Sequence, residues 1–207
     1  MKLRQLTISA FLAAVTLILA PAGANAMTFE RVDGAQICKT DPCVLATGEI
    51  EKGTAGEFRS FIRASDIHAG ATVVFDSPGG ALLESLALGR AIRDAGLYTA
   101  IGRYDRERGE FTTGAACISA CAYAFLGGVQ RDVGAKARFG VHQFAAAPGV
   151  PDSVSVSDAQ ALMGLISAYM TRMVGNSSLL VLAAGTPPSG SYWLSSRELR
   201  NCAVVTN

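Results

Sequence analysis

The sequence is short of charge and of histidine. Charged residues make up only 17% of its 207 residues, the formal net charge is +1, and the only histidines are His68 and His142. A nearly neutral chain gives no electrostatic reason to expect nucleic acid as a partner. The histidines do not stand at zinc-finger spacing from the cysteines, and no glycine-rich phosphate-binding motif is present. We therefore expect no metal ion, no cofactor and no nucleic-acid partner.

Long hydrophobic runs are missing beyond the N-terminal segment, so no later stretch is predicted to cross a membrane. Within residues 1–26, two basic residues precede an apolar run from Leu6 to Leu19, and Ala24-Asn25-Ala26 has small residues at the positions of a cleavage site. This pattern favours a secretory signal peptide over an uncleaved anchor, because the run is short for a full span. We expect cleavage after Ala26 and an exported protein, periplasmic or secreted, that keeps no stable membrane anchor.

The sequence also lacks internal repeats and long low-complexity segments, which suits a single domain over residues 27–207. Half of its residues are hydrophobic, which is enough for a sizeable core. The predicted strands span residues 44–50, 72–75 and 97–101, and the predicted helices between them span residues 55–64 and 81–95. Strands and helices that alternate at these lengths imply right-handed parallel crossovers. The predicted fold class is α/β with a mostly parallel sheet.

The rest of the chain contains less regular predicted elements. Residues 27–44 look irregular, and the polar residues 102–113 are predicted to form a solvated loop or hairpin over the mouth of the site. The later predicted elements are a strand at residues 137–144, helices at 157–173 and 178–184, a helix with a capping box from Ser195 to Glu198, and a final strand at 202–205.

Five cysteines are present, and export would permit disulfides. Cys38 and Cys43 flank a short loop and could close locally. Cys117 and Cys121 bracket Ser119, and a bond between them would be strained if Cys121 lay one helical turn from Cys117. We therefore expect one of these two to pair with Cys202, and one thiol to stay free.

The segment around Ser119 is the centre of the functional prediction. Glycine and small residues precede the serine, and an apolar run of helical length follows it. Small residues permit a tight strand-to-helix turn, and the unpaired N–H groups and the dipole of a helix start favour developing negative charge. This geometry suits a serine nucleophile. The alternative interpretation is that Ser119 only caps a buried helix.

Two further motifs lie where a parallel sheet binds ligands, at the carboxyl ends of strands. Ser77-Pro78-Gly79-Gly80 follows a predicted strand, and its glycines let backbone N–H groups approach a ligand closely. A simple tight turn is the alternative. His142 ends another predicted strand, where it could act as a general base or be structural.

In this order and at these spacings, the three motifs resemble the Clp protease proteolytic subunit of the Clp/crotonase superfamily. The Cys-x-Ser-x-Cys motif around Ser119 is similar to that of its exported bacterial branch. The resemblance covers roughly residues 44–205 and implies a Clp/crotonase-like spiral of ββα units with a mostly parallel sheet.

The same resemblance implies roles for individual residues. Ser119 would be the nucleophile and His142 the general base. The N–H groups of Gly79 and Ala120 would form the oxyanion hole, and Gly80 would contact substrate.

The acid that completes the family's triad is not found at its expected place. The family's Asp should precede an aromatic-Leu-Ser segment, which here is residues 193–195, and the matching residue is Ser191. Charge-assisted orientation of the histidine would then be lost. Asp76, Asp152 and Asp158 remain candidates to replace it, and nothing in the sequence selects one.

The leading functional hypothesis is an exported serine hydrolase, a peptidase acting by acyl transfer on peptides or unfolded protein. The matching long helix builds ring contacts in the family, so a homo-oligomer is expected. The main alternative is a binding or scaffold protein that keeps the fold without catalysis. Export argues against an acyl-CoA enzyme, since coenzyme A is intracellular. A Ser/Lys protease ranks low, because Lys136 is the only lysine after Lys52.

Overall fold

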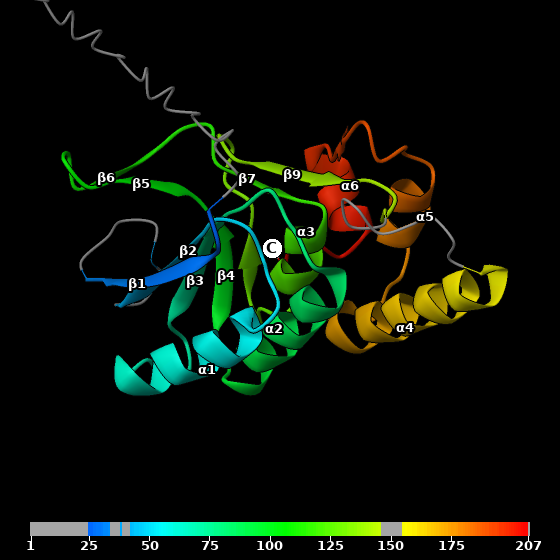
Figure 1. Ribbon diagram of the computed structural model, residues 1–207. Coiled ribbons are helices and arrows are strands. Elements are labelled where there is room, and N and C mark those ends of the chain that lie inside the picture. Colours follow the sequence, from blue (N-terminus) through cyan, green and yellow to red (C-terminus); the bar gives the residue numbers. More distant parts are fainter. Residues whose placement is uncertain (1–24, 34–37, 39–41, 146–154, 207) are drawn as a thin grey trace, which may run out of the picture.

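The computed structural model describes residues 25–33, 38, 42–145 and 155–206. Its centre is a five-stranded sheet in the order β1-β2-β3-β4-β8 (Figure 1). These strands are β1 (Thr28–Val32), β2 (Cys43–Thr47), β3 (Thr72–Asp76), β4 (Tyr98–Ile101) and β8 (Arg131–Asp132). Strands β2, β3, β4 and β8 are parallel, and β1 adds an antiparallel edge. The predicted mostly parallel sheet is confirmed.

The central strands are short apolar runs because both faces of this sheet are covered, one by helices and the other in part by Tyr104 and Phe111. All of β3 except its last residue is buried, as is typical of a parallel strand with both faces covered. Helices α1 (Thr54–Ala64) and α2 (Leu82–Asp94) connect β2 to β3 and β3 to β4, and Figure 1 shows them together against the sheet. Phe58 of α1 is fully buried and meets Phe29 of β1 edge-on, with ring centroids 5.2 Å apart.

A second sheet, in the order β10-β9-β7, positions the site. It consists of β7 (Ala116–Ile118), β9 (Arg138–Val141) and β10 (Tyr192–Trp193). Strands β7 and β9 are parallel, and β10 pairs antiparallel with β9. Helix α3 (Ala120–Phe125), buried throughout, begins one residue after β7. The residues that leave β7 and β9 therefore emerge side by side at one edge of this sheet.

The polar segment at residues 102–113 does form a hairpin, of strands β5 (Arg103–Asp105) and β6 (Glu110–Thr112). Its predicted position over the site is wrong. Figure 1 shows the hairpin at the side of the molecule away from the ends of α3 and β9. Arg103 explains this placement, since it pairs with Asp76 at 2.6 Å and holds the hairpin near the end of β3.

Three helices complete the described chain: α4 (Val156–Val174), α5 (Leu179–Ala184) and α6 (Ser196–Asn201). The predicted capping box of α6 is confirmed, because Ser195 and Glu198 each bind the other's backbone N–H. In the described residues, no helix has the length and apolar character needed to span a membrane. The predicted signal peptide falls on residues 1–24, outside the described residues, and on Asn25 and Ala26, whose backbones pair with Glu49.

Two local predictions are wrong. Residues 28–32, expected to be irregular, form β1, because an edge strand needs only one partner and a single apolar face. Residues 202–205 do not form a strand. Ala203 has φ 52°, and the Val204 N–H turns back to bind the Leu199 carbonyl. The apolar character of residues 202–205 has another explanation, since the Val204 side chain is buried in the core although its backbone forms a turn.

The cysteine pairing differs in part from the expectation. The Cys38–Cys43 disulfide is confirmed, but Cys117 pairs with Cys121, and Cys202 is a buried free thiol. The expectation of strain assumed that Cys117 belongs to the helix. It lies instead in β7, and the sharp turn at Ser119 brings the two Cα atoms to 5.3 Å, within the ordinary disulfide range.

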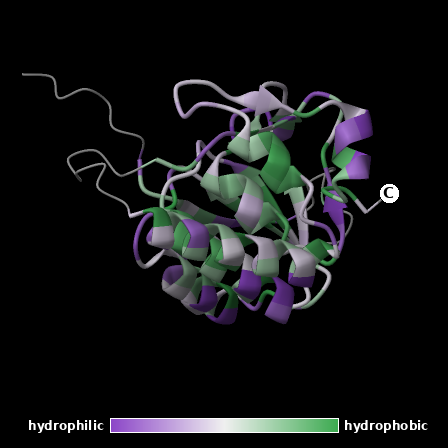
Figure 2. Ribbon diagram, turned by 90° about the vertical axis from the view of Figure 1, so that its right-hand side faces the viewer, coloured by the Kyte–Doolittle hydropathy of each residue, from purple (hydrophilic) through white to green (hydrophobic). Residues whose placement is uncertain are grey.

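The hydrophobic core lies between the main sheet and the helices, and it extends under α3 to the second sheet. Figure 2 shows hydrophobic residues in the interior and hydrophilic ones on the outer turns of the helices. Arg131 ties the C-terminal segment to this core, because its guanidinium donates to the carbonyls of Gly128, Ala203 and Val204. Burial lowers the pKa of Arg131 to about 10, so it remains charged at neutral pH.

Candidate active site

Ser119 is the single residue between β7 and α3, and it adopts a strained backbone conformation. Its φ is 58° and its ψ is −124°, in a region that residues other than glycine rarely adopt. Such a conformation costs about 1–3 kcal/mol and is concentrated at functional sites. A sharp strand-to-helix turn of this kind also exposes the serine hydroxyl of hydrolases that use a nucleophile elbow. The local geometry therefore fits a nucleophile better than an ordinary helix cap, and the Ser119 side chain makes no capping hydrogen bond.

The glycine loop that follows β3 packs directly against this turn. Ser77 accepts from Ile118 and donates to Ala116 through its backbone, which makes the loop a short extension of the second sheet. A Cβ on Gly79 would lie 2.8 Å from the Ser119 Cβ, and Gly79 has φ 108°. Glycine is required here both for the close approach and for the backbone conformation.

The backbone N–H groups near Ser119 differ in their availability. The Gly79 N–H donates to Ser77 Oγ at 3.2 Å, so the predicted oxyanion donor already has a partner. Within the described part of the chain, the N–H groups of Gly80 and Ala120 have no acceptor, and both residues line the same cavity as Ser119. Ala120 is the first residue of α3, where an unpaired N–H is expected. The geometry thus favours Gly80 over Gly79 as the partner of Ala120 in an oxyanion hole.

His142 follows the last residue of β9, beside the strand that leads to Ser119. The two strands are held in register, since Ile118 is paired with Gly140 and the Ser119 N–H donates to the Gly140 carbonyl at 3.0 Å. Gly140 also leaves room for the ring of Trp193, which a Cβ would approach within 2.9 Å. Within the described residues, no hydrogen bond joins Ser119 to His142. Catalytic hydrogen bonds are often long without substrate, so this does not exclude a pair.

Among the described residues, the His142 ring has one hydrogen bond, from Nδ1 to the main-chain carbonyl of Gln143 at 2.6 Å. A carbonyl oxygen only accepts, so Nδ1 must carry the proton. The neutral ring then has its lone pair on Nε2, which is the nitrogen that takes the proton in a serine triad.

The residues considered for the third triad position lie in different places. Tyr192 of β10 is paired with Val141 of β9. Extending this antiparallel register by one residue places Ser191 opposite His142. Asp76 bonds Arg103 and the Ala116 N–H, and Asp158 bonds Ser155 at the start of α4, so neither contacts His142. Asp152 lies outside the described residues.

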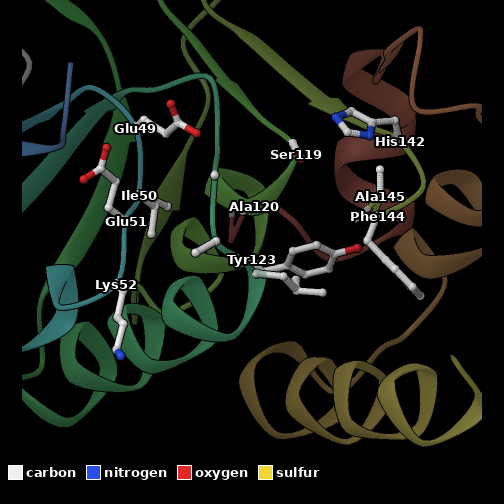
Figure 3. A pocket seen from close by; sticks show the side chains of 13 residues that line it. Glu49, Ile50, Glu51, Lys52, Ser119, Ala120, Tyr123, His142, Phe144 and Ala145 are labelled. Atoms are coloured by element: carbon white, nitrogen blue, oxygen red, sulfur yellow. The ribbon is translucent and has the colours of Figure 1, made fainter. Parts of the chain in front are cut away.

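Ser119 and His142 line one cavity of about 550 Å³ (Figure 3). The lining residues are Glu49, Ile50, Glu51, Lys52, Gly80, Ala81, Leu82, Ser119, Ala120, Tyr123, His142, Phe144 and Ala145. In Figure 3, Ser119 and His142 lie toward one end and the three charged side chains toward the other. Tyr123 also lines this cavity and lies below Ser119 and His142 in this view. Burial raises its pKa to about 12, so it stays neutral and is not a general base at neutral pH.

A smaller and more apolar cavity of about 240 Å³ lies next to His142. It shares Tyr123, His142 and Phe144 with the larger one, and Met163 and Leu180 add apolar surface from α4 and α5. The two cavities together give room for a chain that passes Ser119 with an apolar side chain beside His142.

Neither of the two described lysines lies close to the serine. Lys136 is exposed and lines a different cavity, beside Ala137 and Gly134. Lys52 does line the Ser119 cavity, but Figure 3 shows it at the far end from the serine. The arrangement therefore supports base catalysis by histidine rather than by lysine.

Several residues of this site were not predicted from the sequence. Residues 49–52 form one wall because the backbone of Ile50 pairs with that of the glycine loop, a contact between segments distant in the chain that no local pattern announces. Tyr123 could have been found, because one helical turn from Ser119 places it on the same side of α3. The Gln143 carbonyl carries no sequence signal at all.

Comparison with known proteins supports the fold. No protein-family model and no curated protein matches the chain. Among solved structures, it is similar to the crystal structure of the ClpP protease catalytic domain from Plasmodium falciparum, with a TM-score of 0.52 and 16% identity, covering 76% of this chain and 79% of that chain. Similarity at this identity shows the fold alone. The predicted Clp-like α/β fold is confirmed, and the roles of the site residues stay predictions.

Proposed function

We propose that the chain is an exported serine hydrolase, a peptidase that cleaves peptides or unfolded protein by acyl transfer. The observation that carries this proposal is the strained Ser119, which lines one cavity with the N–H groups of Gly80 and Ala120, neither of which has an acceptor among the described residues. Backbone strain of this kind is concentrated at functional sites, and unpaired backbone N–H groups in the same cavity are suited to bind an oxyanion. The similarity to a protease catalytic domain supports the same class of reaction.

In the proposed mechanism, Ser119 Oγ attacks the substrate carbonyl while His142 Nε2 accepts its proton. The Gly80 and Ala120 N–H groups bind the oxygen that becomes negative. Protonated His142 then donates its proton to the leaving amine, and water releases the acyl group by the same steps. Each donor of an oxyanion hole contributes about 10²–10³ in rate, so two backbone donors support catalysis even without a carboxylate beside the histidine.

The test is covalent labelling. Purified protein is treated with a fluorophosphonate, and the modified peptide is identified by mass spectrometry. We expect modification at Ser119, its loss in Ser119→Ala, and no loss in Ser189→Ala, which removes an exposed serine from the loop before β10. Circular dichroism checks that both variants fold. Absence of labelling on folded wild type, or labelling at another serine, would contradict the proposal.

A binding or scaffold protein is the second candidate, and one observation favours it. None of the described carboxylates contacts His142, and Ser191 stands where the family has its acid. The two functions separate in the same experiment, since a scaffold would bind peptide in the cavity equally well as wild type and as Ser119→Ala, without labelling or turnover.

A further inference from the structure

The hydrogen bond from His142 to Gln143 has a consequence for how this site operates without a triad carboxylate. Two tasks fall to that carboxylate in a serine protease: it holds the histidine in the correct tautomer and orientation, and it stabilises the imidazolium. Only the second task needs a charge. Any fixed acceptor at Nδ1 can perform the first.

The main-chain carbonyl of Gln143 is such an acceptor, because two other hydrogen bonds hold this residue. Its N–H donates to the Thr186 carbonyl at 2.8 Å, and its side-chain Nε2 donates to the Ala184 carbonyl at 2.7 Å. Thr186 is itself bound back to α5, through its Oγ1 to the Leu182 carbonyl at 2.9 Å.

The side chain of Gln143 has a reason to stay in this position. Ala184 ends α5, so its carbonyl lacks a partner within the helix and accepts from the Gln143 amide instead. Helix α5 is anchored in turn by Leu179 and Ala183, which are buried in the core. The chain from core to α5, from α5 to Gln143 and from Gln143 to the ring is therefore continuous.

We propose that the Gln143 carbonyl fixes the tautomer of His142 in place of the missing carboxylate, and that the Gln143 side chain is the positioning group that holds the carbonyl. The substrate-side role of His142 rests on the proposed function above, but the tautomer does not. Ser191, which is opposite the ring in register, is then not the residue that orients it.

The test reads the ring directly. Protein with ¹⁵N-labelled histidine is examined by two-bond ¹H–¹⁵N correlation spectroscopy above the imidazole titration, with His68→Gln to assign the two rings. We expect wild-type His142 to be protonated at Nδ1 and unprotonated at Nε2. Gln143→Leu, which keeps the volume but removes the amide donor, should shift the ring toward the Nε2–H tautomer. Ser191→Ala and the exposed control Gln160→Leu should leave the ring unchanged.

A second readout follows fluorophosphonate labelling of Ser119. General-base catalysis contributes about 10²–10⁴-fold, so a mis-oriented ring in Gln143→Leu should slow labelling by at least about tenfold, with Ser191→Ala close to wild type. An Nε2–H tautomer in wild type, or a shift toward that tautomer in Ser191→Ala, overturns the inference without need of any folded Gln143 variant. An Nδ1–H ring in a protein whose Ser119 is never labelled would support the inference and overturn the proposed function alone.

Discussion

At the scale of single residues, the proposed mechanism depends on Ser191, which stands where the resemblance to the Clp protease leads one to expect an Asp. Ser191 is opposite His142 in register but brings no negative charge, so the imidazolium that the proposed acylation would form should be less stabilised than in a triad. In a serine protease, replacing the triad Asp with Asn lowers kcat by about 10⁴. Part of that loss reflects a wrong tautomer, which the Gln143 carbonyl prevents here. The remaining deficit should come from charge alone.

Ser191→Asp should restore part of this charge at small steric cost. We expect the pseudo-first-order rate of fluorophosphonate labelling at neutral pH to rise by at least about tenfold, which corresponds to about 1.4 kcal/mol. Ser189→Asp is the matched control, because it adds the same charge to the same loop at an exposed position. Equal rates for wild type and Ser191→Asp, with the fold intact, would show that residue 191 does not act on His142.

Much of the site could be predicted from the types of residue in the three motifs and from the order of the motifs along the chain. Ser119, His142, Gly80 and Ala120 were all selected from sequence, and the structure brings them to one cavity. The sequence could not decide whether Gly79 or Gly80 is the better candidate for the oxyanion donor. That choice depends on which N–H is already bonded, and Ser77 Oγ binds that of Gly79 only because the loop curls back on itself.

At the scale of elements, one disulfide spans the β7–α3 junction and has one of its cysteines on each side of Ser119. Cys117 lies in β7, Cys121 lies in α3, and both are fully buried. The bond closes a very short loop around the residue with positive φ. It thereby opposes relaxation of Ser119 toward an ordinary backbone conformation, which would move the hydroxyl relative to the proposed oxyanion donors.

The double variant Cys117→Ala/Cys121→Ala tests this brace. The chain-entropy model gives a loss of about 2 kcal/mol in unfolding free energy for so short a loop. We also expect labelling of Ser119 to slow by at least about tenfold, since an oxyanion donor alone contributes about 10²–10³. Chemical denaturation and labelling rates measure the two effects.

The matched control is Cys38→Ala/Cys43→Ala. That bond spans a sequence separation of 5 residues against 4, but it lies at the start of β2, away from the carboxyl ends of the strands. It should lose similar stability and keep the labelling rate. Thiol counting of unreduced, denatured wild type should give one thiol, that of Cys202. If both double variants labelled equally fast, the brace would be purely structural.

Helices and strands could be predicted where buried apolar residues form an unbroken run or recur at helical spacing. The β3 strand and helices α1 and α2 have unbroken apolar runs or helical spacing, and each was found within one or two residues. The edge strand β1 and the two-residue strand β10 were not, because their pairing partners lie elsewhere in the chain. The Cys117–Cys121 pairing was missed for a related reason, since it depends on one unusual φ.

At the scale of the whole molecule, helix α4 is covered only in part. Its buried residues, Ile166, Tyr169, Met170 and Met173, all belong to the C-terminal half. Figure 1 shows the other half extending away from the sheets and helices of the main body. A projecting half-helix of about ten residues is marginal in water without tertiary packing. Apolar side chains on it, Val156 and Leu165, are 77% and 46% exposed.

This exposed half-helix favours self-association, so we expect a homo-oligomer in which a second copy covers it. Leu165→Glu would bury a charge in that contact, which is strongly unfavourable unless the charge is paired. Light scattering at micromolar concentration should therefore give a mass of several chains for wild type and a smaller mass for Leu165→Glu. Gln160→Glu, which adds a charge at an exposed position of the same half-helix, should leave the assembly closer to wild type. A wild-type monomer would contradict the expectation, and Ser119 labelling by that monomer would show that the site is complete within one chain.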